Sequence, residues 1–310
     1  MDRNAMPLTF PELSELSSTR KLRRQVIHQG LLLMKRILTI QDISCVGKCS
    51  LTVALPVISA AQIETCVLPT AVLSTHTEFK GFTFCDLTNE IDPITKHWIQ
   101  EKIAFDAIYT GYLGSFEQLA LVEKLIDDFK TDDNLVFIDP VMGDLGRLYV
   151  GFDQAFADRM ALFCSRADVL VPNLTEASFM LHTPYIESGY DEKYIDETLE
   201  KLLDLGPKVA VLTGISFEKG QLGVVGVDSR TGQKISYFRD ELEGRYHGTG
   251  DIFASSALAA LVRERTLNDA FAIAANFVAD SIQATLDNPQ ARLYGVDFET
   301  ALPSFARQFA

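Results

Sequence analysis

The sequence predicts a three-layer α/β/α sandwich, built on a mostly parallel, doubly wound sheet with an antiparallel edge. Three observations predict this fold class. Short β-branched segments alternate with longer amphipathic ones, and several of the short segments are apolar throughout. Late in the chain, two consecutive strand-like segments follow each other with no helix between them. Apolar residues make up 47% of the 310 residues, which is enough for one large core.

Residues 1–33 differ in composition from everything that follows. Five basic residues oppose three acidic ones, which gives this segment a net charge of +2. The whole chain has a net charge of −14, so the remaining 277 residues carry −16. The apolar triplet Leu31-Leu32-Leu33 is too short for a secretory signal, and Met34 directly precedes the first predicted strand. We interpret 1–33 as a non-native or disordered N-terminal extension and 34–310 as one folded domain.

The predicted strands begin directly after this segment. In chain order they are 36–40, 66–73, 107–113, 135–141, 168–172 and 208–214. The run Leu135-Val136-Phe137-Ile138 is apolar on both faces, as in a parallel sheet that helices cover on both sides. Segments 221–228 and 233–238, joined by a turn at 229–232, form the predicted antiparallel edge.

The predicted helices lie between these strands and after them. They cover 49–62, 93–103, 116–130, 153–165, 191–205, 250–264 and 267–285. In 116–130 the apolar residues fall on one helical face, namely Leu119, Val122, Leu125, Ile126 and Phe129. Alternating strands and helices imply right-handed βαβ units, and such sheets bind ligands at the carboxyl ends of their strands.

Composition excludes several function classes. A net charge of −14 disfavours a general nucleic-acid binder, because an acidic surface repels phosphate backbones. No apolar run reaches the roughly 18 residues of a membrane span. The five cysteines are odd in number and scattered, which indicates thiols in a reducing cytoplasm rather than disulfides or a zinc site. The chain also lacks a P-loop, a G-x-S-x-G elbow and an H-E-x-x-H motif.

The strongest chemical signal is the turn Gly248-Thr249-Gly250-Asp251, which leads into a helix that is apolar nearly all round. Glycines allow close backbone approach, and the first amides of a helix form an anion site. Asp251 then has two interpretations, a simple helix cap or a general base. A base beside an anion hole is what phosphoryl transfer to an alcohol requires.

Further acidic residues follow two other predicted strands. Asp139 and Asp144 come after the apolar strand 135–141, and Asn173 and Glu176 come after 168–172. The spacing of Asn173 and Glu176 is also that of a capping box, and loop acids can serve solvation alone. If they face the cleft, these oxygen ligands suit Mg²⁺.

The ordered set of motifs resembles the ribokinase-like superfamily, through the Gly248–Asp251 turn and Asn173-x-x-Glu176. Within it, the chain resembles the pyridoxal (pyridoxine, pyridoxamine) kinases from about residue 34 to 302. The supporting motifs are Ser44 within 41–47, the segment 74–77, Thr110-Gly111-Tyr112, the Asp139–Asp144 motif and Thr213-Gly214.

The resemblance implies a role for each position. Asp251 is the expected base on the 5′-hydroxymethyl group of a vitamin B6 vitamer. The expected anion hole is Gly248, Thr249 and Gly250, and the expected metal side is Asp144 and Glu176. Nucleotide phosphates are expected at Asp144, Asn173, Thr213 and Gly214, under a lid at 144–149. The expected vitamer pocket is Ser44, His76, Thr77 and Tyr109.

The resemblance further implies ATP and Mg²⁺ as cofactors, with a monovalent cation such as K⁺ as an additional candidate. It implies salvage of pyridoxal 5′-phosphate, no nucleic-acid or membrane partner, a cytoplasmic location and a homodimer. Asp42 and Lys48 depart from what relatives often carry, which leaves the vitamer open. The alternatives are a hydroxymethylpyrimidine kinase of thiamine biosynthesis, a sugar kinase, whose usual β lid has no counterpart here, and a non-catalytic nucleotide sensor. Loss of Asp251 would mark the sensor, and Asp251 is present.

Overall fold

The structure is a computed structural model that describes residues 34–292 and 294–310. Our expectation for residues 1–33 therefore lies outside the described residues. Lys35–Ala310 form one compact unit.

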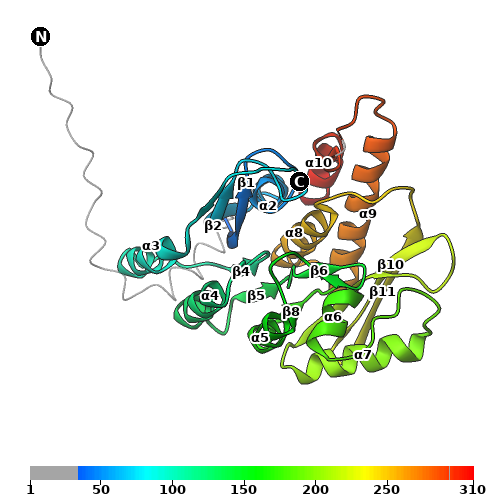
Figure 1. Cartoon of the computed structure of the whole chain (residues 1–310), viewed down its shortest axis with the longest axis horizontal. Coiled ribbons are helices and arrows are strands. Elements are labelled where there is room, and N and C mark those ends of the chain that lie inside the picture. Colours follow the sequence, from blue (N-terminus) through cyan, green and yellow to red (C-terminus); the bar gives the residue numbers. More distant parts are fainter. Residues whose placement is uncertain (1–33, 293) are drawn as a thin grey trace, which may run out of the picture. The chain divides into compact units, whose positions relative to one another are not determined.

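One mixed sheet runs through this unit. Its strand order is β11-β10-β9-β8-β5-β4-β1-β2-β3 (Figure 1). Six neighbouring strands are parallel: β1 (Arg36–Ser44), β2 (Glu64–Leu73), β4 (Ala107–Thr110), β5 (Leu135–Ile138), β8 (Val169–Leu170) and β9 (Val209–Ile215). The hairpin of β10 (Gln221–Asp228) and β11 (Gln233–Asp240) adds the antiparallel edge. The predicted sheet is confirmed, and the short β3 (Phe84–Asp86) adds a second antiparallel edge that was not predicted.

Helices cover both faces of the sheet (Figure 1). One core contains side chains of α3 (Thr88–Gln100), α4 (Phe116–Phe129), α5 (Gln154–Cys164), α6 (Leu174–Met180) and α7 (Glu192–Asp204). The other core contains side chains of α2 (Leu51–Ala60), α8 (Thr249–Val262), α9 (Leu267–Leu286) and α10 (Phe298–Ala306). Val136 and Ile138 of β5 enter the first core and Phe137 enters the second, as expected for a strand that is buried on both faces.

Local sequence explains where many of these helices begin. In five of them the N-cap side chain accepts a hydrogen bond from the backbone N–H three residues on, which satisfies one otherwise unpaired donor. These caps are Ser115, Asp153, Asn173, Asp191 and Thr266. Helix α10 was not predicted, and neither was the short hairpin of β6 (Gly143–Asp144) and β7 (Arg147–Leu148).

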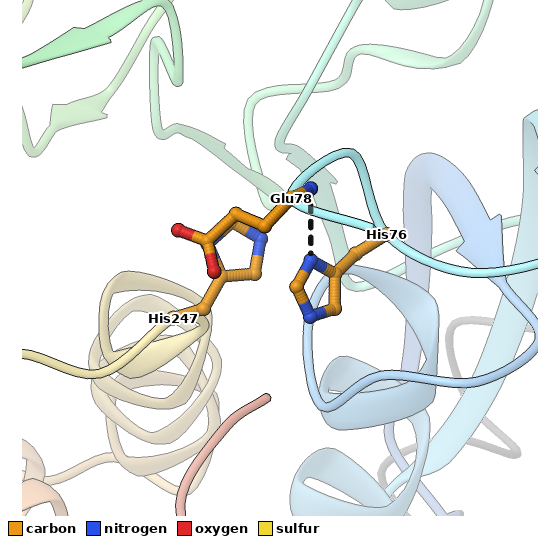
Figure 2. Close-up of side chains that lie close together, drawn as sticks. All are labelled: His76, Glu78 and His247. Atoms are coloured by element: carbon orange, nitrogen blue, oxygen red, sulfur yellow. Dashed lines mark hydrogen bonds and ion pairs between the residues drawn. The ribbon is translucent and has the colours of Figure 1, made fainter. Parts of the chain in front are cut away.

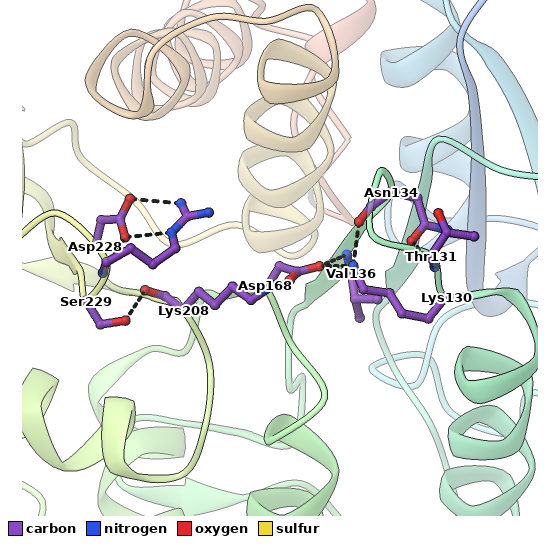
Figure 3. Close-up of polar contacts among 9 residues, drawn as sticks. Lys130, Thr131, Asn134, Val136, Asp168, Lys208, Asp228 and Ser229 are labelled. Carbon is purple, nitrogen blue, oxygen red and sulfur yellow. Dashed lines mark hydrogen bonds and ion pairs between the residues drawn. The ribbon is translucent and has the colours of Figure 1, made fainter. Parts of the chain in front are cut away.

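Asp168 ties together the amino ends of β5, β8 and β9, and its contacts are drawn in Figure 3. These ends lie at the opposite edge of the sheet from the predicted chemistry. Its carboxylate accepts from Lys130 Nζ at 2.5 Å, Lys208 Nζ at 2.6 Å and the Val136 N–H at 2.8 Å. Burial alone would raise the pKa of Asp168, but the hydrogen bonds from Lys130 and Lys208 outweigh it and lower that pKa below 3.8. This carboxylate therefore stabilises the sheet and takes no part in the site at the carboxyl edge.

Within residues 34–292 and 294–310, we find no helix that combines the length and the apolar character needed to cross a bilayer.

Candidate active site

The glycine-rich turn at the start of α8 has a backbone that only glycine can adopt. Gly248 is the N-cap of α8 with φ of 80°. A Cβ at this position would lie 1.8 Å from the carbonyl oxygen of Lys48. At Gly250, by contrast, a Cβ would meet no described atom within 4 Å, so the turn is open to a ligand there. Because a glycine N-cap has no side chain to occupy the first amides, this helix end can bind an anion.

Asp251 follows in the first turn of α8. Burial raises its pKa from 3.8 to about 7, against the stabilising hydrogen bond from the Ser50 N–H. The negative charge of nearby Asp42 raises the pKa further. Asp42 is itself buried and is held by Ser50 Oγ at 2.6 Å and Ser44 Oγ at 3.3 Å. A carboxylate with a pKa near neutrality is suited to accept a proton at physiological pH.

Two buried acids lie nearby, Asp139 beyond the end of β5 and Glu176 at the start of α6. Burial raises the pKa of Glu176 to about 7. Burial also raises the pKa of Asp139, and the negative charges of Glu176 and Asp251 raise it further. Asp139, Glu176 and Asp251 are therefore close enough to one another to disfavour ionisation of all three carboxyl groups at once.

This crowding of carboxylates fits a divalent cation, which would relieve their mutual repulsion. Glu176 already accepts hydrogen bonds from the Met142 N–H at 3.0 Å and the Asn173 N–H at 2.9 Å, one on each oxygen. A third backbone N–H, that of Gly143, also stabilises this carboxylate. A carboxylate has about four acceptor sites, so capacity remains for contact with the ordered waters that Mg²⁺ retains. The capping box predicted as the alternative role of Asn173 and Glu176 is also formed. Glu176 therefore has a structural role whatever it does toward a metal.

The β6–β7 hairpin forms the segment predicted as a lid. Leu145 and Gly146 at its tip have φ of 53° and 72°, the left-handed conformations of a tight hairpin turn. The Gly146 N–H donates to Thr175 Oγ1 at 2.9 Å, and Asn173 Nδ2 donates to the Gly143 carbonyl at 2.9 Å. Both bonds hold the hairpin against the start of α6, and Asp144 is exposed on it.

The predicted phosphate residues Asn173 and Thr213 are brought together by the sheet. They form a parallel bridge just beyond β8, and the Thr213 N–H donates to the Pro172 carbonyl at 3.0 Å. Gly214 has φ of 71° and faces open space among the described residues. Asn173, Thr213 and Glu176 therefore share one region at the carboxyl edge of the sheet, which is where their predicted roles require them.

The predicted vitamer-pocket residues occupy different environments. Ser44 and His76 are buried and Thr77 is exposed. Tyr109 has no exposed surface and packs edge-on against Phe137 inside the sheet, with ring centroids 5.7 Å apart. Its role in the pocket stays a prediction, and in this conformation it could act only through other residues.

Three residues at this edge were missed as site candidates. Tyr112 lies past the end of β4, where burial and then the charge of Asp42 raise its pKa. Ending the predicted strand at residue 110 instead of 113 would have revealed it. Lys48 pairs with Asp297 at 2.7 Å and Glu299 at 2.9 Å, and its carbonyl packs against Gly248. His247 stacks on His76 with ring centroids 4.4 Å apart (Figure 2).

A doubly wound sheet with a glycine-capped helix and a half-buried acid at its carboxyl edge defines a phosphoryl-transferring enzyme of the ribokinase-like class. Comparison with known proteins agrees with this class. A sequence model described as phosphomethylpyrimidine kinase matches residues 56–293. The chain belongs to this phosphomethylpyrimidine kinase family.

Individual relatives extend the match. The pyridoxal kinase of Lactobacillus plantarum is 30% identical, with a TM-score of 0.82 and coverage of 89% of this chain and 98% of that chain. A candidate phosphomethylpyrimidine kinase of Bacteroides thetaiotaomicron, solved with pyridoxal, is 37% identical, with a TM-score of 0.83 and coverage of 88% and 96%. The hydroxymethylpyrimidine/phosphomethylpyrimidine kinase of Bacillus subtilis is 27% identical over 189 residues, which cover 61% of this chain and 67% of the relative.

These findings confirm the resemblance to pyridoxal kinases of the ribokinase-like superfamily. The chain is a kinase, so the alternative of a non-catalytic nucleotide sensor loses its support.

Proposed function

We propose that this kinase transfers the γ-phosphoryl group of ATP to the 5′-hydroxymethyl group of a vitamin B6 vitamer, in salvage of pyridoxal 5′-phosphate. One observation carries the proposal: the Asp251 carboxylate, with its pKa raised to about 7, stands in the same helical turn as the glycine-capped anion site. The similarity to a pyridoxal kinase and to a protein solved with pyridoxal supports this substrate class.

In the proposed reaction, Asp251 accepts the proton of the substrate hydroxyl as its oxygen attacks the phosphorus. The amides of the turn at Gly248, Thr249 and Gly250 stabilise the charge on the transferred group. Because these donors belong to a backbone fixed against Lys48, they need no reorganisation during the reaction.

ATP and Mg²⁺ are the proposed cofactors, with a monovalent cation such as K⁺ as an optional third. Mg²⁺ would neutralise charge on the nucleotide phosphates. Glu176 and Asp144 would hold it, largely through water, and Asn173, Thr213 and Gly214 would contact the phosphates. The hairpin tip at Leu145 and Gly146 would cover them.

The decisive experiment measures phosphorylation of pyridoxal, pyridoxine, pyridoxamine and hydroxymethylpyrimidine with Mg²⁺ and ATP, with the phosphorylated product identified chromatographically. Asp251→Asn protein, purified in parallel, is the matched control for contaminating host kinases. We expect the wild type to phosphorylate at least one B6 vitamer and the variant to be strongly impaired. Turnover of hydroxymethylpyrimidine alone would refute the proposal.

That last outcome is the second candidate function, and the family match favours it. The matching family description and the Bacillus subtilis relative both name pyrimidine substrates. A kinase acting on hydroxymethylpyrimidine needs the same base and anion hole, because it too phosphorylates a hydroxymethyl group on a small heterocycle. Hydroxymethylpyrimidine phosphate added to the screen distinguishes an enzyme with both steps from one with the first alone.

We also propose a cytoplasmic homodimer with one complete site in each subunit. All five cysteines, which lie in the described part of the chain, are free thiols, as expected in a reducing compartment. Phe84 on the edge strand β3 is exposed, and so are Phe79 and Phe82 in the loop before it, where a partner could cover them. Light scattering at micromolar concentration tests the dimer, and a monomer mass would refute it.

A further inference from the structure

Ser50 is a strained residue that lies between two acids of the site. Its φ is 50° and its ψ is −134°, close to the first central position of a type II′ turn, which glycine dominates. Ser50 is nevertheless buried, and it is the N-cap of α2, a helix that packs beside α8 (Figure 1). Strained residues persist only where neighbouring contacts hold them, and they concentrate at functional sites.

The Ser50 hydroxyl is diverted from the usual task of an N-cap. A serine N-cap ordinarily accepts a hydrogen bond from an amide of the first helical turn. In the part of the chain that the structure describes, Ser50 makes no such bond. Its Oγ instead donates to Oδ1 of Asp42 at 2.6 Å, and Oδ2 of Asp42 accepts from Ser44 Oγ at 3.3 Å. The bond to this buried carboxylate therefore locks Ser50 in its strained conformation.

The backbone of the same segment supports the proposed base. The Ser50 N–H donates to the Asp251 carboxylate. Two residues earlier, the Lys48 carbonyl oxygen lies against the glycine N-cap of α8, where a Cβ would come within 1.8 Å of it. The Lys48 side chain is anchored by Asp297 at 2.7 Å. Residues 48–50 thus form a fixed support beside the start of α8, with one donor aimed at Asp251.

We propose that Ser50 is a positioning residue, which Asp42 locks so that its backbone N–H holds the Asp251 carboxylate in the orientation that accepts the substrate proton. The inference rests on the proposed function, because it takes Asp251 to be the base. Without the hydroxyl bond, an L-residue at position 50 relaxes toward negative φ and withdraws its N–H from Asp251. Glycine keeps the N–H in place more readily, because it adopts positive φ without steric cost.

The test compares turnover of Ser50→Ala with that of Ser50→Gly. Alanine lacks the lock, so we expect kcat to fall about tenfold to a hundredfold, as when a catalytic group is misplaced, with KM little changed. Glycine should recover most of this loss although it also lacks the hydroxyl. The matched control is Thr266→Ala at the N-cap of α9, whose hydroxyl does cap its helix. It should lower the free energy of unfolding and leave kcat unchanged. Equal losses of kcat in the alanine and glycine variants would contradict the proposal.

The pH profile separates positioning from a mere loss of stability. In Ser50→Ala the Asp251 carboxylate loses a donor, so its pKa rises and the acid limb of kcat/KM moves to higher pH. Asp42→Asn keeps an acceptor for the Ser50 hydroxyl but removes a negative charge near Asp251, so the limb moves to lower pH. Both variants retain the other titratable groups that sense the charge of Asp251, which are Cys49, Tyr109, Asp139 and Tyr149.

Carbon-13 NMR of the aspartate carboxyl groups follows the same titration without turnover. The Asp251 signal is identified by its absence from Asp251→Asn protein, and its midpoint should move as the acid limb does. A protein that phosphorylates no vitamer would refute the proposed function, while the midpoints still decide whether Ser50 holds the Asp251 carboxylate. Identical midpoints in the wild type and in Ser50→Ala would overturn the inference.

Discussion

Replacing Asp251 with Asn should make the protein both much less active and more stable above neutral pH. Asn is nearly isosteric, and its Oδ1 can still accept the hydrogen bond from the Ser50 N–H that Asp251 accepts. It cannot, however, accept the proton of a substrate hydroxyl. We expect turnover to fall by about 10²–10⁴, the usual contribution of a general base.

The stability gain follows from the pKa of Asp251, which is 3.8 in its ordinary state and about 7 in the folded protein. Between pH 3.8 and about pH 7 the folded state holds a proton that the unfolded state has released, so the wild type loses stability as the pH rises through this range. Above pH 7 the loss reaches an upper limit of about 4 kcal/mol. Asn also forgoes about 0.3–1 kcal/mol of favourable charge–dipole interaction in the first turn. The variant should therefore be more stable by about 1–3 kcal/mol at pH 8, and the difference should vanish near pH 4.

Urea unfolding of both proteins at pH 8 and pH 5, in the absence of nucleotide, measures this difference, and ADP formation measures turnover. In the wild type, kcat/KM should fall as the pH drops below about 7, because the base of the free enzyme becomes protonated. An Asn variant that is less stable than wild type at pH 8 would refute the desolvation argument. Near-normal turnover would remove Asp251 from the mechanism.

Four further substitutions test other parts of the site and the fold. Gly250→Ala should leave stability within about 1 kcal/mol, since its Cβ meets no described atom, yet lower turnover about a hundredfold by obstructing the anion site. Gly248→Ala should instead destabilise by about 2 kcal/mol or more in urea, because its Cβ collides with the Lys48 carbonyl; equal stability of the two variants would contradict this. Glu176→Gln should lower the free energy of unfolding by about 1–3 kcal/mol, because the amide oxygen is one acceptor for the two N–H donors of Met142 and Asn173. The variant should also need more Mg²⁺ for activity. An unchanged unfolding curve would count against the structural role, and an unchanged Mg²⁺ titration against the metal role. Asp168→Asn should lower the free energy of unfolding by about 3 kcal/mol at pH 7 without changing turnover. The pKa of Asp168 is lower in the folded state than in the unfolded state, so this difference should disappear as acid protonates the wild-type carboxylate. A constant difference down to strong acid would argue against the ion-pair explanation.

The sequence determined the layers of the fold because hydrophobic periodicity reports burial directly. The apolar run at 135–138 required a strand covered on both sides, and the structure places its alternate residues in the two cores. The hairpin at 221–228 and 233–238 was equally readable, since its two strands follow each other across a short turn. Short elements escaped notice: β3, β6 and β7 have two or three residues each, too few to show a period.

The candidate site divides in the same way. The Gly248–Asp251 turn and the Asn173–Glu176 cap could be identified from sequence, because glycine and capping residues mark backbone geometry locally. The sequence alone could not show which of Tyr109 and Tyr112 is the better candidate site residue. That depends on which of them lies beyond the end of β4.

Only the tertiary structure decided the electrostatics and the long-range contacts. The pKa values near 7 of Asp251 and Glu176 arise from burial, to which segments far apart in the chain contribute. The need for glycine at 248 comes from the Lys48 carbonyl oxygen, 200 residues earlier in the sequence, which a Cβ on residue 248 would approach to 1.8 Å. The stacked rings of His76 and His247 likewise join two distant loops that no spacing rule connects. Sequence periodicity reports which side of an element is buried, but the identity of the neighbour across a contact is fixed only when the chain folds.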